Sequence, residues 1–165
     1  MGQLVGVHKK EKMSLINDRL KQLNIVLPPA PAPAANYVPY VKSNKLIFVS
    51  GQIPMLNGEL VTGKVGKNIE IEDAKTAARL CGLAIVSQLN EATDLDLDKI
   101  KRIVKLGGFV NCIDEFTQQP EIINGASDLM VEVFGDKGKH SRFAVGTNSL
   151  PRNVVVEIEA VAEIH

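Results

Sequence analysis

The sequence has few cysteines, no excess of either charge and no long apolar run. Its two cysteines, Cys81 and Cys112, fall in a helical and a strand pattern, so we expect buried thiols and no disulfide framework. The 19 basic and 19 acidic residues give zero net charge, which makes nucleic acid an unexpected partner. No apolar run approaches the ~20 residues of a membrane span, and the first residues lack the order of a signal peptide. We therefore expect a cytoplasmic protein without a membrane partner.

Motifs of the common catalytic machineries are missing as well. The sequence holds no G-x-S-x-G, H-E-x-x-H, C-x-x-C or G-x-G-x-x-G, and its histidines are scattered at His8, His140 and His165. The glycine-containing run at 63–67 lacks the spacing of a phosphate-binding loop. Nothing in the sequence supports a metal or redox site, so we expect neither a metal nor a cofactor.

What is present is typical of one globular chain with a sizeable core. The length is 165 residues, with 45% hydrophobic and 23% charged residues. Ser14 is suited to cap a short amphipathic helix that runs to about Leu23, and a proline-rich, extended linker follows at 28–33. We expect residues 1–34 to form an N-terminal extension and residues 35–165 to form the main domain.

The rest of the chain predicts an α+β fold. Gly51, at the end of a β-former run, indicates a bulge or a close backbone approach, and Gly107-Gly108 is expected to interrupt the longest strand. Two helices among five or six strands favour a mixed sheet with both helices on one face, which leaves the other face to be covered by self-association. Strands are predicted at 37–42, 45–50, 100–112, 142–147 and 154–162, a short hairpin around 57–58, and helices at 69–92 and 120–134.

The chemistry is concentrated in residues 140–162. Arg142 lies in an apolar run, and because arginine keeps its charge when desolvated, it needs an acidic partner or an anionic ligand. Alternation places Glu157 and Glu159 on one face of the last strand. Two interpretations follow. Arg142 forms an ion pair with one of these glutamates, or it binds a small carboxylate while a glutamate positions water or a proton.

Two motifs carry a family resemblance. The SGQIP sequence at Ser50–Pro54 and the R-x8-P-x5-EIEA pattern from Arg142 to Ala160 resemble the Rid family. These are the YjgF-type reactive-intermediate deaminases, also catalogued as L-PSP endoribonucleases, and the resemblance covers roughly Ala35 to Ile164. It implies a chorismate-mutase-like fold, a homotrimer with clefts between subunits, and a hydrolase that converts 2-imino or enamino acids to 2-keto acids and ammonia.

The resemblance also implies roles for individual residues. Arg142 would bind the substrate carboxylate, and Glu157 would take part in activating water. Tyr37, Gly51 and Asn124 would line the substrate pocket.

Some neighbours of the arginine depart from the family pattern, which indicates a distinct subgroup. His140 and Ser141 precede the arginine, Ala144 stands where a cysteine is common, and Ser127 replaces a helix aromatic. His140 could tune the site, although an exposed loop histidine is the simpler interpretation. These departures keep open a trimer that binds small carboxylates without turnover, and endoribonuclease activity is a weaker alternative.

Overall fold

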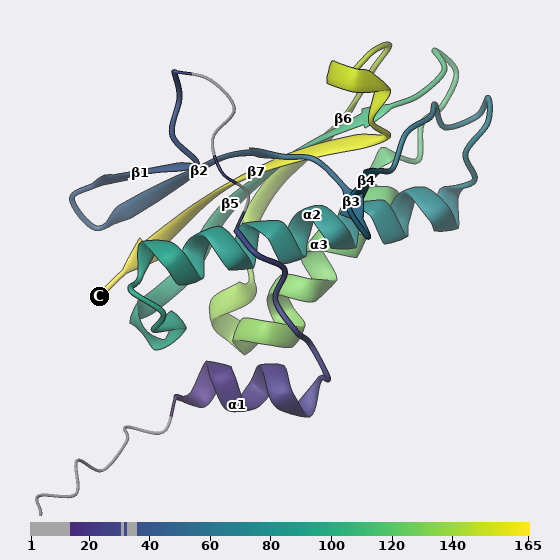
Figure 1. Ribbon diagram of the computed structural model, residues 1–165. Coiled ribbons are helices and arrows are strands. Elements are labelled where there is room, and N and C mark those ends of the chain that lie inside the picture. The colour runs from purple at the N-terminus through teal and green to yellow at the C-terminus, as the bar shows by residue number, and fades with distance from the viewer. Residues whose placement is uncertain (1–13, 31, 33–35) are drawn as a thin grey trace, which may run out of the picture.

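The computed structural model describes residues 14–30, 32 and 36–165. Its main sheet has five strands, and two long helices lie on one face of it (Figure 1). The α+β architecture predicted from the sequence is confirmed. The helices are α1 (Leu15–Gln22), α2 (Ile71–Ala92) and α3 (Gln119–Phe134), with 3-10 turns η1 (Leu97–Lys99), η2 (Gly135–Gly138) and η3 (Pro151–Asn153). The strands are β1 (Tyr40–Ser43), β2 (Leu46–Gln52), β3 (Met55–Leu56), β4 (Glu59–Leu60), β5 (Ile100–Asn111), β6 (Ser141–Thr147) and β7 (Val156–Ile164).

The strand order decides which residues can meet. The sheet runs β1-β2-β7-β5-β6, with β6 parallel to β5 and the other pairs antiparallel. Although β6 and β7 are consecutive in the chain, β5 lies between them. The side chains of β6 and β7 are therefore not direct cross-strand neighbours.

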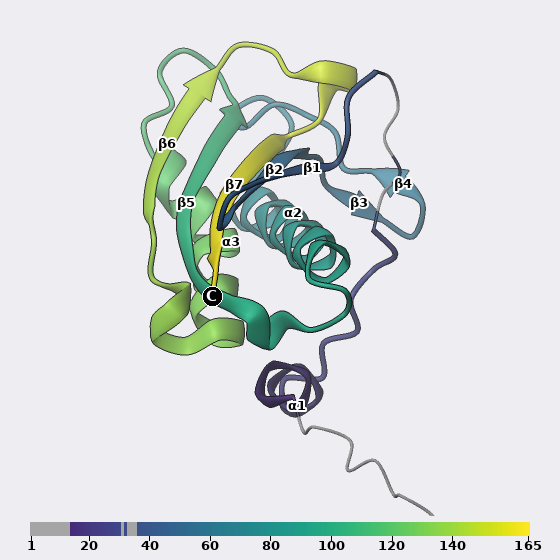
Figure 2. The same ribbon diagram turned by 90° about the vertical axis from the view of Figure 1, so that its left-hand side faces the viewer.

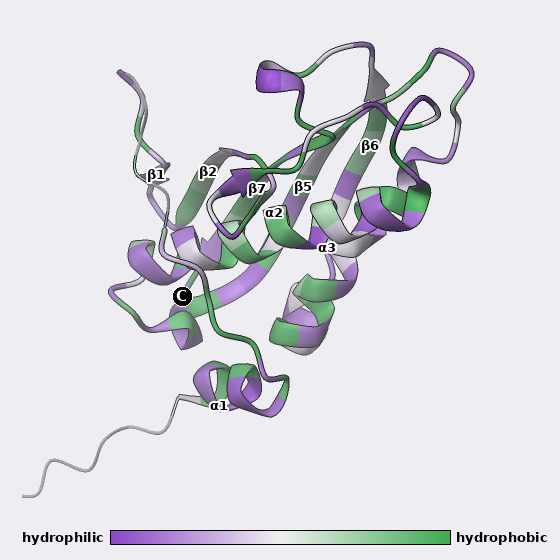
Figure 3. Cartoon of the chain, turned by 45° about the vertical axis from the view of Figure 1, so that its right-hand side comes forward, coloured by the Kyte–Doolittle hydropathy of each residue, from purple (hydrophilic) through white to green (hydrophobic). Residues whose placement is uncertain are grey.

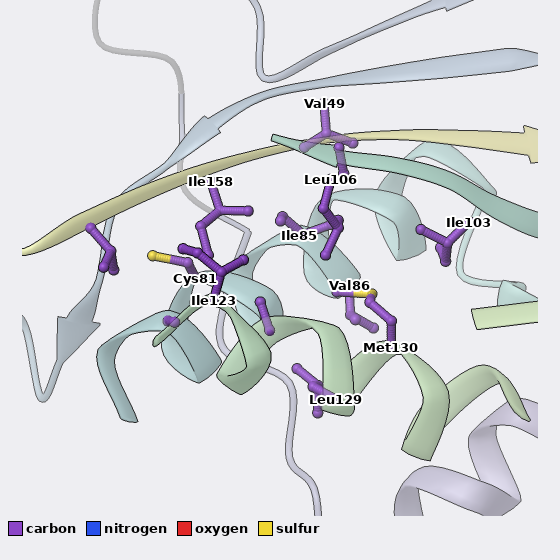
Figure 4. Packing of buried hydrophobic residues seen from close by; sticks show 14 of the residues in the cluster. Val49, Cys81, Ile85, Val86, Ile103, Leu106, Ile123, Leu129, Met130 and Ile158 are labelled. Carbon is purple, nitrogen blue, oxygen red and sulfur yellow. The ribbon is translucent and has the colours of Figure 1, made fainter. Parts of the chain in front are cut away.

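The core fills the space between the sheet and the helices α2 and α3. Figure 4 shows Ile85 of α2 and Ile123 of α3 pointing toward Leu106 and Ile158 of the sheet, and all four are fully buried. Burying an aliphatic side chain of this size contributes about 1.5–3 kcal/mol. This layer therefore holds α2 and α3 against the sheet.

Glycines let the two long helices approach closely. A Cβ on Gly82 of α2 would lie 2.9 Å from Leu129 of α3, and a Cβ on Gly125 of α3 would collide with the carbonyl of Lys75. The cost of a glycine inside a helix, about 1 kcal/mol relative to alanine, is therefore offset here by close packing.

The N-terminal helix α1 is anchored to this body. Ser14 Oγ accepts the N–H of Asn17, as expected for an N-cap, and the Asp98 carboxylate accepts the N–H groups of Leu15 and Ile16 at 3.0 and 2.9 Å. Figure 3 shows apolar and polar faces on α1, and Leu20 is buried.

The segment after α1 crosses α2 on its way to the sheet (Figure 1). Ser87 Oγ donates to the carbonyl of Pro28 at 2.8 Å. The predicted linker lies partly outside the described residues, at 31 and 33, and the division of the chain after residue 34 stays a prediction.

The two predictions about glycines in the sheet have different outcomes. The pairing of β2 with β7 shifts by one residue between Val49 and Gln52, so the bulge expected at Gly51 is confirmed. The predicted interruption at Gly107-Gly108 is wrong, because β5 continues through both residues. The reason is close packing. Cβ atoms there would meet Phe143 and Glu159 on one face and Ile123 on the other.

The second face of the sheet carries no helix in the described part of the chain (Figure 2). Several apolar side chains stand on it, and the rings of Phe109 and Phe143 pack edge to face at 5.3 Å with Lys105 Nζ over Phe143. We call this surface the open face. Its exposed apolar residues include Val41, Phe48, Phe109 and Val145.

Two further expectations concern the thiols and the membrane. Cys81 and Cys112 are both free and buried, as predicted. Burial, and to a lesser extent the charge of Glu157, raises the pKa of the Cys81 thiol. Among the described residues, no helix is long and apolar enough to cross a bilayer.

Candidate functional site

Arg142 lies on β6 and faces the helices. It pairs with Leu106, which is fully buried on the helix side of the sheet. Its guanidinium donates to Ser127 Oγ at 3.0 Å and to the Pro120 carbonyl at 3.3 Å. Within the described ranges no carboxylate forms an ion pair with Arg142. The folded chain therefore does not contain the predicted ion pair of Arg142 with Glu157 or Glu159.

Neutral groups hold the arginine in place of an acid. Ser127 Oγ lies 2.9 Å from His140 Nε2, and His140 Nδ1 lies 2.6 Å from the Gly138 carbonyl. His140, Ser127 and Arg142 are all half-buried. The interpretation of His140 as an exposed loop residue is therefore wrong, because η2 and β6 bring its ring against α3.

Asn124 belongs to the same region. It is half-buried on α3, four residues after Pro120 and three before Ser127, the two residues that Arg142 contacts. Residues at these spacings share one side of a helix. The structure therefore places Asn124 on the helix side along which the guanidinium lies.

Glu157 lies on the open face, next to Gly51. It pairs with Phe109, and a Cβ on Gly51 would stand only 2.5 Å from Glu157 Oε1. Burial and the nearby charge of Glu159 raise the pKa of the Glu157 carboxyl. This glutamate therefore holds a proton at higher pH than an ordinary carboxyl, as a group that both accepts and donates protons requires.

The segment that follows Tyr37 is hydrogen-bonded to Ser50, the residue before Gly51. The carbonyls of Val38 and Pro39 accept hydrogen bonds from Ser50, at 2.7 Å from Oγ and 2.9 Å from the N–H. Tyr37 directly precedes these residues in the chain and is 53% exposed.

The predicted site residues thus form two groups. The arginine group is Arg142 with Asn124, on the helix side at the β6 edge. The glutamate group is Glu157 with Gly51 and Tyr37, on the side of β2 and the open face. With strands ~4.8 Å apart and a rise of ~3.3 Å per residue, the backbones of Arg142 and Glu157 are separated by about 10 Å across the sheet and about 10 Å along it. Their side chains point to opposite faces.

Two pockets of the described residues, of about 480 and 230 Å³, lie elsewhere and do not join the two groups. A pocket of about 480 Å³ lies where β5 and β6 end, lined by residues such as Cys112, Gln119 and Thr147, and none of the predicted site residues lines it. Within the described ranges, no three His, Cys, Asp or Glu side chains gather in a way that could hold a metal ion.

Similar proteins agree with this fold. Residues 17–164 match the family described as "YjgF/chorismate_mutase-like, putative endoribonuclease". Protein TCP17 of Trypanosoma cruzi is 46% identical over 148 residues, 88% of this chain and 92% of the relative. The crystal structure of Atu1372 from Agrobacterium tumefaciens has a TM-score of 0.85 and 48% identity, covering 91% of this chain and 92% of that one.

A more distant structure carries a ligand. Escherichia coli TdcF, solved with bound serine, has a TM-score of 0.56 and 25% identity, covering 82% of this chain and 94% of that one. The fold is therefore the chorismate-mutase-like fold of the YjgF proteins. The chain belongs to the YjgF/Rid family, within a divergent subgroup that includes TCP17 and Atu1372.

Sequence reasoning missed the contact between Ser127 and His140. Each residue departs from the family pattern, but 13 residues separate them and no motif relates them. Only the packing of α3 beside β6 brings them together. The available signal was that both departures from the family pattern precede Arg142 within 15 residues.

Proposed function

We propose that this protein hydrolyses reactive 2-imino or enamino acids to 2-keto acids and ammonia, in clefts between the subunits of a homotrimer. One observation carries the proposal: Arg142 is held by neutral partners alone among the described residues. Its two hydrogen bonds leave three of the five guanidinium N–H groups for a ligand, enough for bidentate contact with a carboxylate. The serine bound to TdcF, itself a small amino acid, is consistent with such a ligand.

The separation of the two groups supports a site shared between chains. β6 is an edge strand, and the glutamate group lies on the side of β2, toward the other edge. Contact between the β6 edge of one chain and the β2 side of the next would bring Arg142 and Glu157 to one cleft. The exposed apolar side chains of the open face, such as Phe48 and Phe109, favour the same assembly because such a surface is usually covered.

The chemistry needs few groups. The guanidinium of Arg142 holds the substrate carboxylate and so fixes the neighbouring C2 imine carbon. Glu157 takes a proton from water as the oxygen adds to C2 of the protonated imine, and a carbinolamine forms. Glu157 then returns the proton to the nitrogen. The C–N bond breaks as the carbinolamine hydroxyl gives its own proton to Glu157 and becomes the carbonyl, and ammonia and the 2-keto acid leave. Orientation and one positioned acid–base group supply about 10²–10⁴-fold.

The test is the release of ammonia and 2-oxobutyrate from 2-iminobutyrate generated in situ. We expect the wild-type protein to accelerate both above the uncatalysed rate, and Arg142→Ala to lose the acceleration while it remains trimeric by light scattering. Equal ammonia release by the wild type, the variant and buffer would reject the proposal.

A second candidate is a trimer that binds a small carboxylate without turnover. It is favoured by Ala144, Ser127 and His140, which replace the usual neighbours of the arginine. Calorimetric binding of 2-oxobutyrate without turnover of any imine tested would select it. Endoribonuclease activity and the cytoplasmic location both stay predictions, and the zero net charge does not favour RNA as a partner.

A further inference from the structure

We infer that Ser127 and His140 are positioning residues that hold the Arg142 guanidinium in its carboxylate-binding orientation. They do so through a series of hydrogen bonds, which we call the hydrogen-bond chain, in which each group donates to the next. The inference rests on the proposed function, because it concerns how the same arginine receives its substrate. Neither residue contacts the reacting atoms in the proposed reaction.

The direction of the chain follows from which groups can donate. A guanidinium only donates, so Ser127 Oγ accepts from Arg142 at 3.0 Å. A carbonyl only accepts, so His140 Nδ1 carries the proton that is shared with Gly138 at 2.6 Å. In the neutral ring Nε2 is then an acceptor, and the Ser127 hydroxyl donates to it at 2.9 Å.

The chain therefore runs from Arg142 through Ser127 and His140 to the Gly138 carbonyl. Every donor in it has an acceptor, and each bond polarises the next. A flexible arginine side chain loses rotamer freedom when it binds a ligand, and a guanidinium already held in place loses less. The chain should therefore strengthen substrate binding and contribute little to the chemical step.

The fold also fixes the Gly138 carbonyl, at which the hydrogen-bond chain ends. Gly138 closes η2, and a Cβ on it would collide with the backbone of Met130 and Val131 in α3. The carbonyl that accepts from His140 therefore sits on a turn packed tightly against the helix that carries Ser127. Because this turn is held rigidly, the His140 ring is fixed, and through Ser127 it fixes the Arg142 guanidinium.

Four variants test the inference. Ser127→Ala removes the middle hydroxyl, Ser127→Thr keeps it, and His140→Phe keeps a ring of similar shape without nitrogen. Ser141→Ala is the matched control. Ser141 adjoins Arg142, but its hydroxyl donates to the Val104 carbonyl, away from the chain.

The first measurement is the NMR signal of the Arg142 guanidinium N–H groups in the ligand-free trimer. We expect sharp, slowly exchanging signals in the wild type, Ser127→Thr and Ser141→Ala, and broadened signals in Ser127→Ala and His140→Phe. The second is turnover of 2-iminobutyrate, for which we expect KM to rise about tenfold in Ser127→Ala and His140→Phe, the equivalent of one charge-assisted hydrogen bond, with kcat within about threefold.

The outcomes separate the two proposals. If Ser127→Ala and His140→Phe keep sharp Arg142 signals and an unchanged KM, the positioning role is wrong while the deaminase proposal stands. If the wild type shows no turnover, the deaminase proposal fails, and the ligand-free signals alone decide the positioning role. Loss of the signals in Ser141→Ala as well would also overturn it.

Discussion

Replacing Gly51 by alanine should remove most activity while leaving the fold intact. An ideal Cβ at this position lies 2.5 Å from Glu157 Oε1, whereas ordinary contacts begin near 3.4 Å. The carboxylate must therefore move by about 1 Å, and a displacement of this size can reduce a catalytic rate by about 10²-fold. The atom that moves is the end of a flexible side chain, so the backbone can stay in place.

The effect on stability should be small because two contributions oppose one another. Pushing the glutamate off its rotamer costs about 0.5–1.5 kcal/mol. Replacing a strand glycine returns about 0.5–1 kcal/mol. The free energy of unfolding, measured by denaturant titration, should therefore change by less than about 1 kcal/mol.

The assay compares Gly51→Ala with Gly107→Ala, whose Cβ would instead press on Phe143 and on Glu159 Oε1 at 2.9 Å. We expect kcat for 2-iminobutyrate to fall about 10²-fold in Gly51→Ala and less than tenfold in Gly107→Ala. If Gly51→Ala keeps full kcat in a folded trimer, Glu157 is not the acid–base group.

Three further predictions concern the arginine, the glutamate and the helix contact. Arg142→Lys keeps the charge but loses the bidentate fork, so KM for 2-iminobutyrate should rise about 10–100-fold, and an unchanged KM would show that a point charge suffices. Glu157 has a raised pKa in the folded chain, so its contribution to stability falls as pH rises from the ordinary value through the raised one. Glu157→Gln should then unfold at higher denaturant concentration than wild type at neutral pH and equally at pH 3, and an opposite sign would contradict the assignment. Gly125→Ala should lower the free energy of unfolding by about 1–3 kcal/mol because its Cβ meets the Lys75 carbonyl, whereas the exposed neighbour Asp128→Ala should stay within about 0.5 kcal/mol.

Local patterns in the sequence predicted the helices well. The 3–4 residue spacing of apolar side chains placed α2 and α3 within two residues of their observed bounds, and Ser14 marked the start of α1. The bulge at Gly51 was also predictable, since a glycine that ends a β-former run is typical of a bulge or a close backbone approach. These features depend on neighbours in the chain, which a sequence displays directly.

The site depended on register and could not be predicted in the same way. The ion-pair alternative assumed that Arg142 and Glu157 meet, but β5 separates their strands and the two side chains face opposite sides. Likewise, Ser127 and His140 are joined only by how α3 packs. Pairings of this kind depend on contacts distant in sequence, for which one sequence holds no local signal.

In the proposed trimer, each cleft takes Arg142 from one chain and Glu157 from its neighbour. The most direct test refolds Arg142→Ala and Glu157→Gln chains together in equal amounts, each inactive alone. If the site is shared, random assembly pairs an intact arginine with an intact glutamate in about one cleft in four, so about a quarter of wild-type activity should return. Mixed trimers, verified by native mass spectrometry, that remain inactive would show that both groups act within one chain or that they do not form the site.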